Sequence, residues 1–195
     1  MALSLNVAWA ACLPGSVFAG DRSSISYDNV DISYQHLFYD EKGQDDGKGL
    51  LLGGEVSPIE NIFFTAEYNF SESAVGRYDI EGHALVYGVG GYFPVNSAMH
   101  LVGIVEGVYE RVKIDTLGTE SENGYQLVAE VRNELDGGIE ANLGAKYRDL
   151  GHGADAWLFG AKGVFPLQNK IALISAVGIS DDSDVELTGG VRFGF

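Results

Sequence analysis

The sequence predicts an all-β fold: a closed antiparallel up-and-down transmembrane β-barrel of about ten strands, with eight strands as the alternative. Two observations lead to this fold class. Apolar and polar residues alternate with a period of two along most of the chain, as in strands with one apolar and one polar face. The connections between these segments alternate between short turns and longer acidic stretches, an asymmetry typical of barrels that cross a membrane.

The composition excludes several other classes. The chain has 195 residues, 46% of them apolar, and a net charge of -16, which suits one folded domain and not a disordered acidic chain. Beyond residue 20, no charge-free apolar run reaches the roughly 18 residues of a transmembrane helix. The Lys and Arg residues are scattered singly, so we expect no nucleic-acid partner, because phosphate backbones bind clustered basic faces.

The first nineteen residues differ from the rest of the chain. Residues 1–19 carry no charge, are mostly apolar and end in Val17-Phe18-Ala19, a pattern that predicts a secretory signal peptide followed by the barrel at 20–195. The alternative is a lipid-bearing Cys12, although Trp9 stands where a lipoprotein signal prefers an aliphatic residue. Cleavage after Ala19 leaves a chain without cysteine, and therefore without disulfides.

In chain order, five segments show the alternation most clearly. They are Val30–Phe38, Ile62–Phe70, Tyr125–Val131, Ile139–Tyr147 and Val185–Phe195, the last of which ends on the final residue. A tilted strand needs about 9–11 residues to cross the hydrocarbon layer, and the segments between connections have this size. The sheet must close, because an open edge in lipid leaves N–H and C=O groups unpaired.

The connections fall into two sets. The short ones contain Pro or Gly, and all three prolines after residue 19 lie in them, where a missing N–H disrupts no ladder. These short connections are residues 57–61, 94–97, 136–138 and 166–169. The longer, acidic or polar connections are residues 40–48, 71–79, 115–124, 149–155 and 181–184. We expect both chain ends on the side of the short turns.

A soluble β-sandwich or small lipocalin-like barrel would show the same alternation with the apolar face inward. The number of aromatic rings argues against this alternative, because a narrow barrel has little room for them. Turned outward, the rings form girdles at the membrane interfaces. The rings expected outside are Tyr27, Tyr34, Phe38, Phe64, Tyr68, Phe70, Tyr109, Tyr125, Tyr147, Trp157, Phe159, Phe165, Phe193 and Phe195.

The charged faces of the strands are expected to line the lumen, since each Arg or Lys facing mid-bilayer costs about 2–4 kcal/mol. The candidate lumen residues are Glu55, Glu67, Glu81, His83, Glu106, Glu110, Glu130, Arg132, Glu140, Lys146, Arg148, Lys162, Glu186 and Arg192. We expect these charges to pair as a plug that keeps the wall rigid. A narrow pore whose acidic lining favours cations is the alternative.

No motif predicts catalysis, a cofactor or a metal site. The chain has no Gly-x-Ser-x-Gly and no two His residues spaced i, i+4. Asp79, Glu81 and His83 alternate on one strand face, but no serine accompanies them, so we interpret His83 as a lumen residue hydrogen-bonded to a Glu. We therefore expect no enzymatic activity. A lipid-modifying enzyme dependent on His83 is the least favoured class.

These features, together with the terminal Val191-Arg192-Phe193-Gly194-Phe195, resemble the small outer-membrane β-barrel proteins of Gram-negative bacteria, the porin-like or opacity-like group. The resemblance implies localisation in the cell outer membrane, among its lipid and lipopolysaccharide. It also implies that the outer-membrane assembly machinery reads the terminal aromatic Phe195, supported by Phe193 and Val191.

We accordingly expect a monomeric barrel with a structural or surface-interaction role, and a narrow channel for small or cationic solutes as the alternative. The acidic connections are expected to project outside the cell as solvated loops, or to hold divalent cations beside lipopolysaccharide phosphates. The loop residues concerned are Asp40, Glu41, Asp45, Asp46, Asp115, Glu120, Glu122, Asp181, Asp182 and Asp184.

Overall fold

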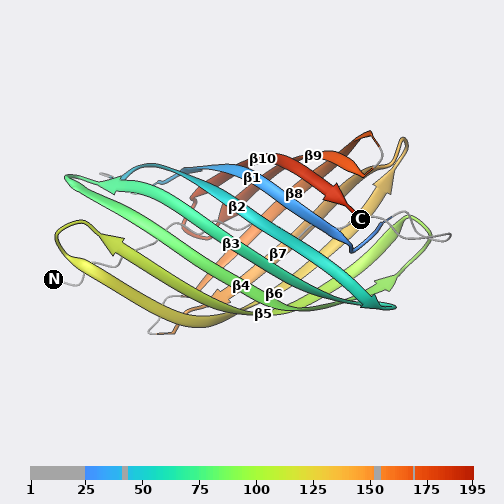
Figure 1. Ribbon diagram of the computed structural model, residues 1–195, viewed down its shortest axis with the longest axis horizontal. Helices are drawn as coiled ribbons and strands as arrows, with labels where there is room; N and C mark the ends of the chain where they lie inside the picture. The colour runs from blue at the N-terminus through green and yellow to red at the C-terminus, as the bar shows by residue number, and fades with distance from the viewer. Residues whose placement is uncertain (1–24, 41–43, 152–154, 169) are drawn as a thin grey trace.

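The computed structural model describes residues 25–40, 44–151, 155–168 and 170–195, so the expected signal peptide at 1–19 lies outside the described residues. Ten antiparallel strands form one closed barrel, in which β1 pairs with both β2 and β10 (Figure 1). The strands are β1 (Asn29–Phe38), β2 (Gln44–Ile59), β3 (Ile62–Val75), β4 (Tyr78–Pro94), β5 (Met99–Ile114), β6 (Gly118–Leu135), β7 (Ile139–Asp149), β8 (Asp155–Gln168), β9 (Ile171–Ser180) and β10 (Val185–Gly194). The predicted fold class is confirmed, with ten strands. No helix long and apolar enough to span a membrane occurs among the described residues.

The two ends of the barrel differ. We call the end that carries the β2–β3, β4–β5, β6–β7 and β8–β9 connections the short-turn end, and the opposite end the hairpin end. Strands β2 to β6 contain 14 to 18 residues, whereas β1, β9 and β10 contain 10 each. The long strands therefore extend one side of the barrel at the hairpin end (Figure 1).

The expected loops at 71–79 and 115–124 are wrong, because both segments continue the sheet. Strands β3 and β4 pair as far as Val75 and Tyr78, which leaves only Gly76 and Arg77 in the turn. Strands β5 and β6 pair as far as Ile114 and Gly118, so that Glu120 and Glu122 lie in β6. Outside a membrane neither face of a strand has to be apolar, so the sequence alternation fades while the backbone pairing continues.

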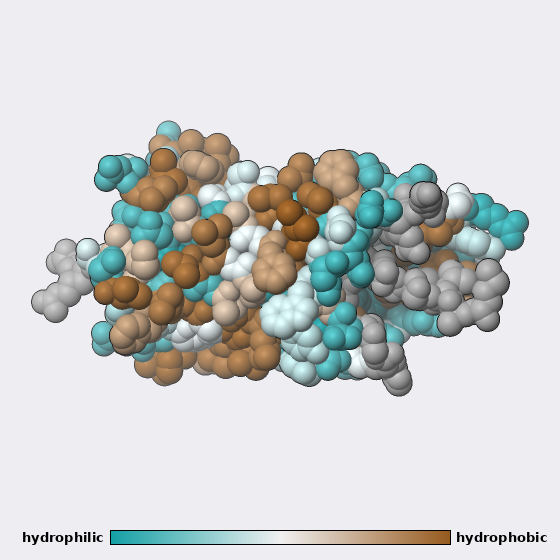
Figure 2. Space-filling model, turned by 180° about the vertical axis from the view of Figure 1, so that it is seen from behind, coloured by the Kyte–Doolittle hydropathy of each residue, from teal (hydrophilic) through white to brown (hydrophobic). Residues whose placement is uncertain are grey.

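On the face that Figure 2 shows, apolar side chains gather over the part of the barrel next to the short turns, and polar side chains gather towards the hairpin end. Large exposed apolar side chains occur on every strand, among them Tyr34, Leu52, Phe64, Tyr87, Val105, Leu127, Leu143, Phe159, Ile179 and Phe193. An apolar exterior of this extent suits a bilayer and not water. Tyr27 was wrongly expected outside. It precedes β1 and is buried within the barrel, with 2% of its surface exposed.

Candidate functional site in the barrel lumen

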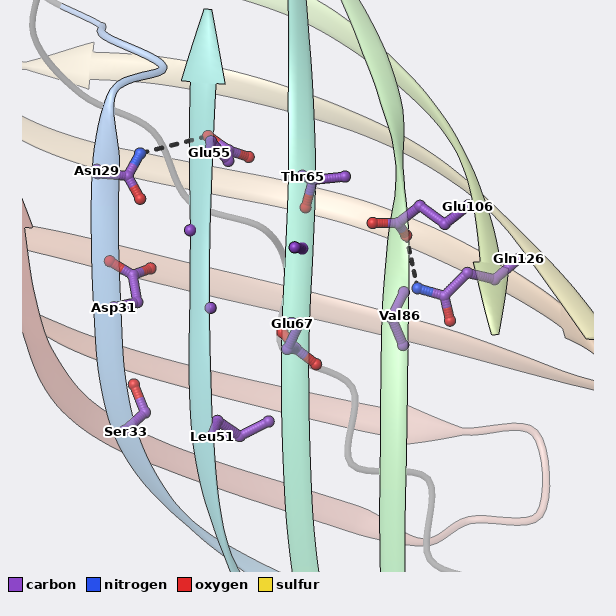
Figure 3. Close-up of a pocket in the computed structure, with 13 residues that line it drawn as sticks. Asn29, Asp31, Ser33, Leu51, Glu55, Thr65, Glu67, Val86, Glu106 and Gln126 are labelled. Carbon is purple, nitrogen blue, oxygen red and sulfur yellow. Dashed lines mark hydrogen bonds between the residues drawn. The ribbon is translucent and has the colours of Figure 1, made fainter. Parts of the chain in front are cut away.

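The lumen contains charged side chains from eight of the ten strands. Among the residues expected there, those buried inside the barrel are Glu55, Glu106, Glu110, Glu130, Arg132, Glu140, Lys146, Arg148, Lys162, Glu186 and Arg192. Glu67 is partly buried and also faces the interior (Figure 3). Asp31 of β1 also belongs to this set, although it was not among the lumen residues predicted from the sequence. The alternation with Val30 and Ile32 already placed it on the inner face.

Arg132 lies at the centre of the first cluster. From β6 it reaches across the lumen to β2, where its Nη1 and Nη2 donate hydrogen bonds to the Glu55 carboxylate at 3.1 and 2.9 Å. Its Nε donates to Glu130, two residues earlier on the same strand. Two carboxylates thus surround one guanidinium, and all three side chains are at most 1% exposed. Removing either partner of such a buried ion pair is strongly destabilising, because the remaining charge is left buried without an opposite charge.

An aromatic cap, consisting of Tyr27, Phe63, Tyr92 and His100, covers this cluster at the short-turn end. The Tyr27 ring stacks on Tyr92 and Phe63 with centroid distances of 4.3 and 4.6 Å, and its hydroxyl lies 3.0 Å from Nδ1 of His100. The Arg132 guanidinium lies 4.8 Å from the Tyr27 ring centroid, within cation–π range. The residues just before β1 therefore fold into the barrel mouth, where the Tyr27 ring lies over the Arg132 guanidinium.

A glycine makes room for the aromatic cap. A Cβ at Gly90 of β4 would lie 2.2 Å from Cζ of Phe63, a distance that no carbon pair tolerates. The Phe63 ring therefore occupies the place that a side chain at Gly90 would take. Gly90, one of the glycines that blur the alternation of β4 in the sequence, is thus explained by packing inside the barrel.

A second cluster lies at the strand pair that closes the barrel. Asp31 of β1 and Arg192 of β10 are register partners, and the guanidinium donates to the carboxylate at 2.7 Å from Nε and 2.5 Å from Nη2. Lys162 of β8 donates to the same carboxylate at 3.2 Å. One inward carboxylate therefore connects three strands across the closing pair.

A third network runs along the wall. Gln126 of β6 donates to Glu106 of β5 at 2.6 Å and accepts from Nε of Arg148 of β7 at 2.9 Å. The interior cavity beside it has a volume of about 20 Å³ and is lined by carboxylates that include Glu67 and Glu106 (Figure 3). This space holds about one water molecule.

Two residues assigned to the lumen face the other way. Glu81 and His83 point outward from β4, where Nζ of Lys113 donates to Glu81 at 3.0 Å and the Tyr68 hydroxyl lies 2.7 Å from Nδ1 of His83. The inner positions of this stretch are Ile80, Gly82 and Ala84. Glu81 and His83 lie on the same face of β4 as Leu85 and Tyr87, which are exposed further along the strand, so this face points outward. The prediction from charge alone therefore placed Glu81 and His83 on the wrong face.

The residues of the expected assembly signal lie on the outside of the barrel. Phe193 and Phe195 are exposed at the short-turn end, and Val191 lies on the same outward face of β10. Within the described ranges, no three His, Cys, Asp or Glu side chains are grouped to hold a metal ion. The lumen is thus a network of ion pairs and hydrogen bonds under an aromatic cap.

Two solved structures share this architecture. Neisserial surface protein A matches with a TM-score of 0.52 at 15% identity, over 87% of this chain and 98% of that one. The translocator domain of the autotransporter NalP from Neisseria meningitidis matches with a TM-score of 0.50 at 12% identity, over 86% of this chain and 88% of that one. No protein-family model and no curated protein matches the sequence. The fold shared with these structures is a closed antiparallel β-barrel, and the apolar exterior of this chain suits a membrane.

Proposed function

We propose that this protein is an integral outer-membrane barrel whose lumen is closed, and that its role is structural or one of surface interaction, without catalysis. The observation that supports the proposal is the position of Tyr27, which packs at the short-turn end over the Glu55–Arg132–Glu130 cluster. A conducting pore needs a continuous wet path, whereas this cross-section holds an aromatic stack with a buried guanidinium beneath it.

The proposal includes partners. Membrane lipid and lipopolysaccharide would surround the apolar exterior, and the assembly machinery would recognise Phe195 together with Phe193 and Val191. The acidic hairpin end would face the outside of the cell, because both ends of the barrel segment, Asn29 and Gly194, lie at the opposite end. We propose that the barrel is a monomer, since its sheet closes on itself and leaves no strand edge open.

Planar-bilayer conductance tests the closed lumen. The unaltered protein is expected to be silent, and Tyr27→Ala is expected to produce discrete steps because it removes the centre of the aromatic cap. Tyr34→Ala is the matched control, since Tyr34 is an exposed outward ring on the neighbouring β1. Steps in the unaltered protein that change with Glu106→Gln or Glu130→Gln would replace this proposal with the cation channel.

Two further measurements test the location and the absence of catalysis. We expect the protein in the outer-membrane fraction, with heat-modifiable migration on a detergent gel, and we expect deletion of Phe195 to lower the folded fraction. An altered lipid A or phospholipid profile on gene deletion, restored by the natural chain but not by His83→Ala, would show that the barrel is an enzyme.

A further inference from the structure

The outer surface carries different charges around the hairpin end. Where the outward face of each strand changes from apolar to polar, β7 and β8 present Asp149 and Asp155, which are register partners. On β2, β4 and β5 the first such residues are Lys48, His83 and Arg111. In the part of the chain that the structure describes, the outward Lys and Arg side chains of the hairpin end lie on β2, β5 and the β3–β4 turn, and the outward His36 of β1 pairs with Asp46 at 3.5 Å. We call Lys48, His83, Arg111 and Lys113 the basic arc.

Arg111 and His83 form the centre of the basic arc. They are register partners on β5 and β4, and both face outward. The Tyr68 hydroxyl holds Nδ1 of His83 at 2.7 Å, which leaves Nε2 as the second polar atom of the ring. Arg111 is exposed and forms no ion pair with any described residue. Its five N–H donors therefore face the surroundings of the barrel.

The flanking cations of the basic arc are held loosely. Lys113 pairs with Glu81 at 3.0 Å and Lys48 with Glu72 at 3.5 Å, and all four side chains are between 43% and 62% exposed. Exposed ion pairs of this kind contribute little to the free energy of unfolding. An anion that binds these cations more strongly than a carboxylate therefore displaces Glu81 and Glu72 readily. A phosphate group is such an anion, because it accepts the bidentate fork of Arg at the same time as a Lys ammonium.

The surface next to the basic arc is apolar. Continuing along the outward faces of β4 and β5 towards the short-turn end, the next side chains are Leu85 and Tyr87, and Tyr109 and Val105, all exposed. A ligand that satisfies both surfaces carries a phosphate at one end and acyl chains at the other. The tyrosines suit the boundary between the two, where aromatic side chains gather in membrane barrels.

We propose that the basic arc binds the phosphorylated headgroup of a lipid whose acyl chains lie along the apolar face of β4 and β5. The inference rests on the outer-membrane location proposed above, and it commits to lipid-borne phosphate, of which lipopolysaccharide is the example in that membrane. Among the described residues, the Asp149–Asp155 side has no comparable group of cations, so the lipid contacts of the two sides would differ.

Native mass spectrometry of the folded barrel in neutral detergent tests the proposal. The probes are diphosphorylated lipid A, the same lipid after removal of its phosphates, and inorganic phosphate alone. We expect Arg111→Gln with Lys113→Gln to bind the phosphorylated lipid about tenfold more weakly, the scale of one charge-assisted hydrogen bond. Arg77→Gln is the matched control, because it removes an exposed cation from the β3–β4 turn, farther from the apolar surface.

The outcomes are distinct. Equal binding of lipid A by the natural chain and the double variant would overturn the proposal, as would equal binding of the lipid without phosphate. Tight binding of inorganic phosphate would show an anion site and overturn the assignment to lipid. Heat-modifiable migration verifies that each variant is folded. Since conductance and fractionation do not depend on the basic arc, failure here leaves the proposed closed outer-membrane barrel standing.

Discussion

One ion pair inside the lumen and one on the outer surface of the hairpin end each join a basic side chain to a glutamate at nearly the same distance. Arg132 and Glu55 meet at 2.9 Å, and Lys113 and Glu81 meet at 3.0 Å. Their exposure differs completely, at 0% and 1% against 50% and 43%. Burial, and not distance, therefore determines how much each ion pair contributes to the free energy of unfolding. On the outer surface water solvates a charge that has lost its partner, whereas in the lumen it does not.

The same difference separates two functions. In the lumen, charges hold opposite walls together, as Arg132 does between β6 and β2. On the outer surface, charges remain available to other molecules, and Arg111 is the clearest case. Four substitutions test this comparison, and they are ordered by the size of the expected effect on the free energy of unfolding.

The largest effect is expected for Arg132→Ala, which leaves Glu55 and Glu130 buried without their cation. We expect a loss of about 3–5 kcal/mol in the free energy of unfolding, measured by urea titration of the barrel in detergent. The triple variant Glu55→Leu, Glu130→Leu, Arg132→Met removes the whole cluster and is expected to cost less. A triple variant less stable than Arg132→Ala would contradict this account.

The next effect is expected at the closing strand pair. Asp31→Asn keeps the shape of the side chain but removes the charge shared by Arg192 and Lys162, at a cost of about 2–3 kcal/mol. The same titration measures the loss, and heat-modifiable migration reports whether closure survives. Asp155→Asn, an exposed carboxylate of β8, is the control and is expected to unfold as the natural chain does. Equal effects of the two changes would show that the β1–β10 pair does not depend on Asp31.

A smaller effect is expected for Tyr27→Phe. The ring and its stacking on Tyr92 remain, and only the hydroxyl that meets His100 is lost, which costs about 0.5–1.5 kcal/mol. The bilayer is expected to stay silent with this variant, in contrast to Tyr27→Ala. Conductance steps from Tyr27→Phe would mean that the hydrogen bond, and not the stack, closes the mouth.

The smallest effect is expected for Lys113→Gln on the outer surface. Because Lys113 and Glu81 are about half exposed, the change is expected to cost at most about 0.5 kcal/mol. Comparing urea titrations at low and high salt checks this, since salt screens exposed pairs and hardly affects the Arg132 cluster. A loss comparable to that of Arg132→Ala would remove the distinction between the two regions.

The barrel could be predicted from the sequence better than its interior. Strand alternation, closure and the apolar exterior follow from residues that repeat every two positions, such as those of β1 and β7. The expected faces of Glu81 and His83 were wrong, because polar residues outside the membrane obey no single parity. The predicted position of Tyr27 was wrong for a related reason. Tyr27 precedes β1, so the alternation of the strand does not predict which way its side chain points.

By itself the sequence determined that the strands have one apolar face, that there are about ten of them and that Lys and Arg avoid the lipid, because these properties are local and repeat along the chain. Only the tertiary structure decided that Arg132 meets Glu55, 77 positions away, and that Tyr27 stacks on Phe63 inside the barrel mouth. Such contacts depend on barrel register and on the space left by residues such as Gly90, and neither is encoded in any short stretch of residues.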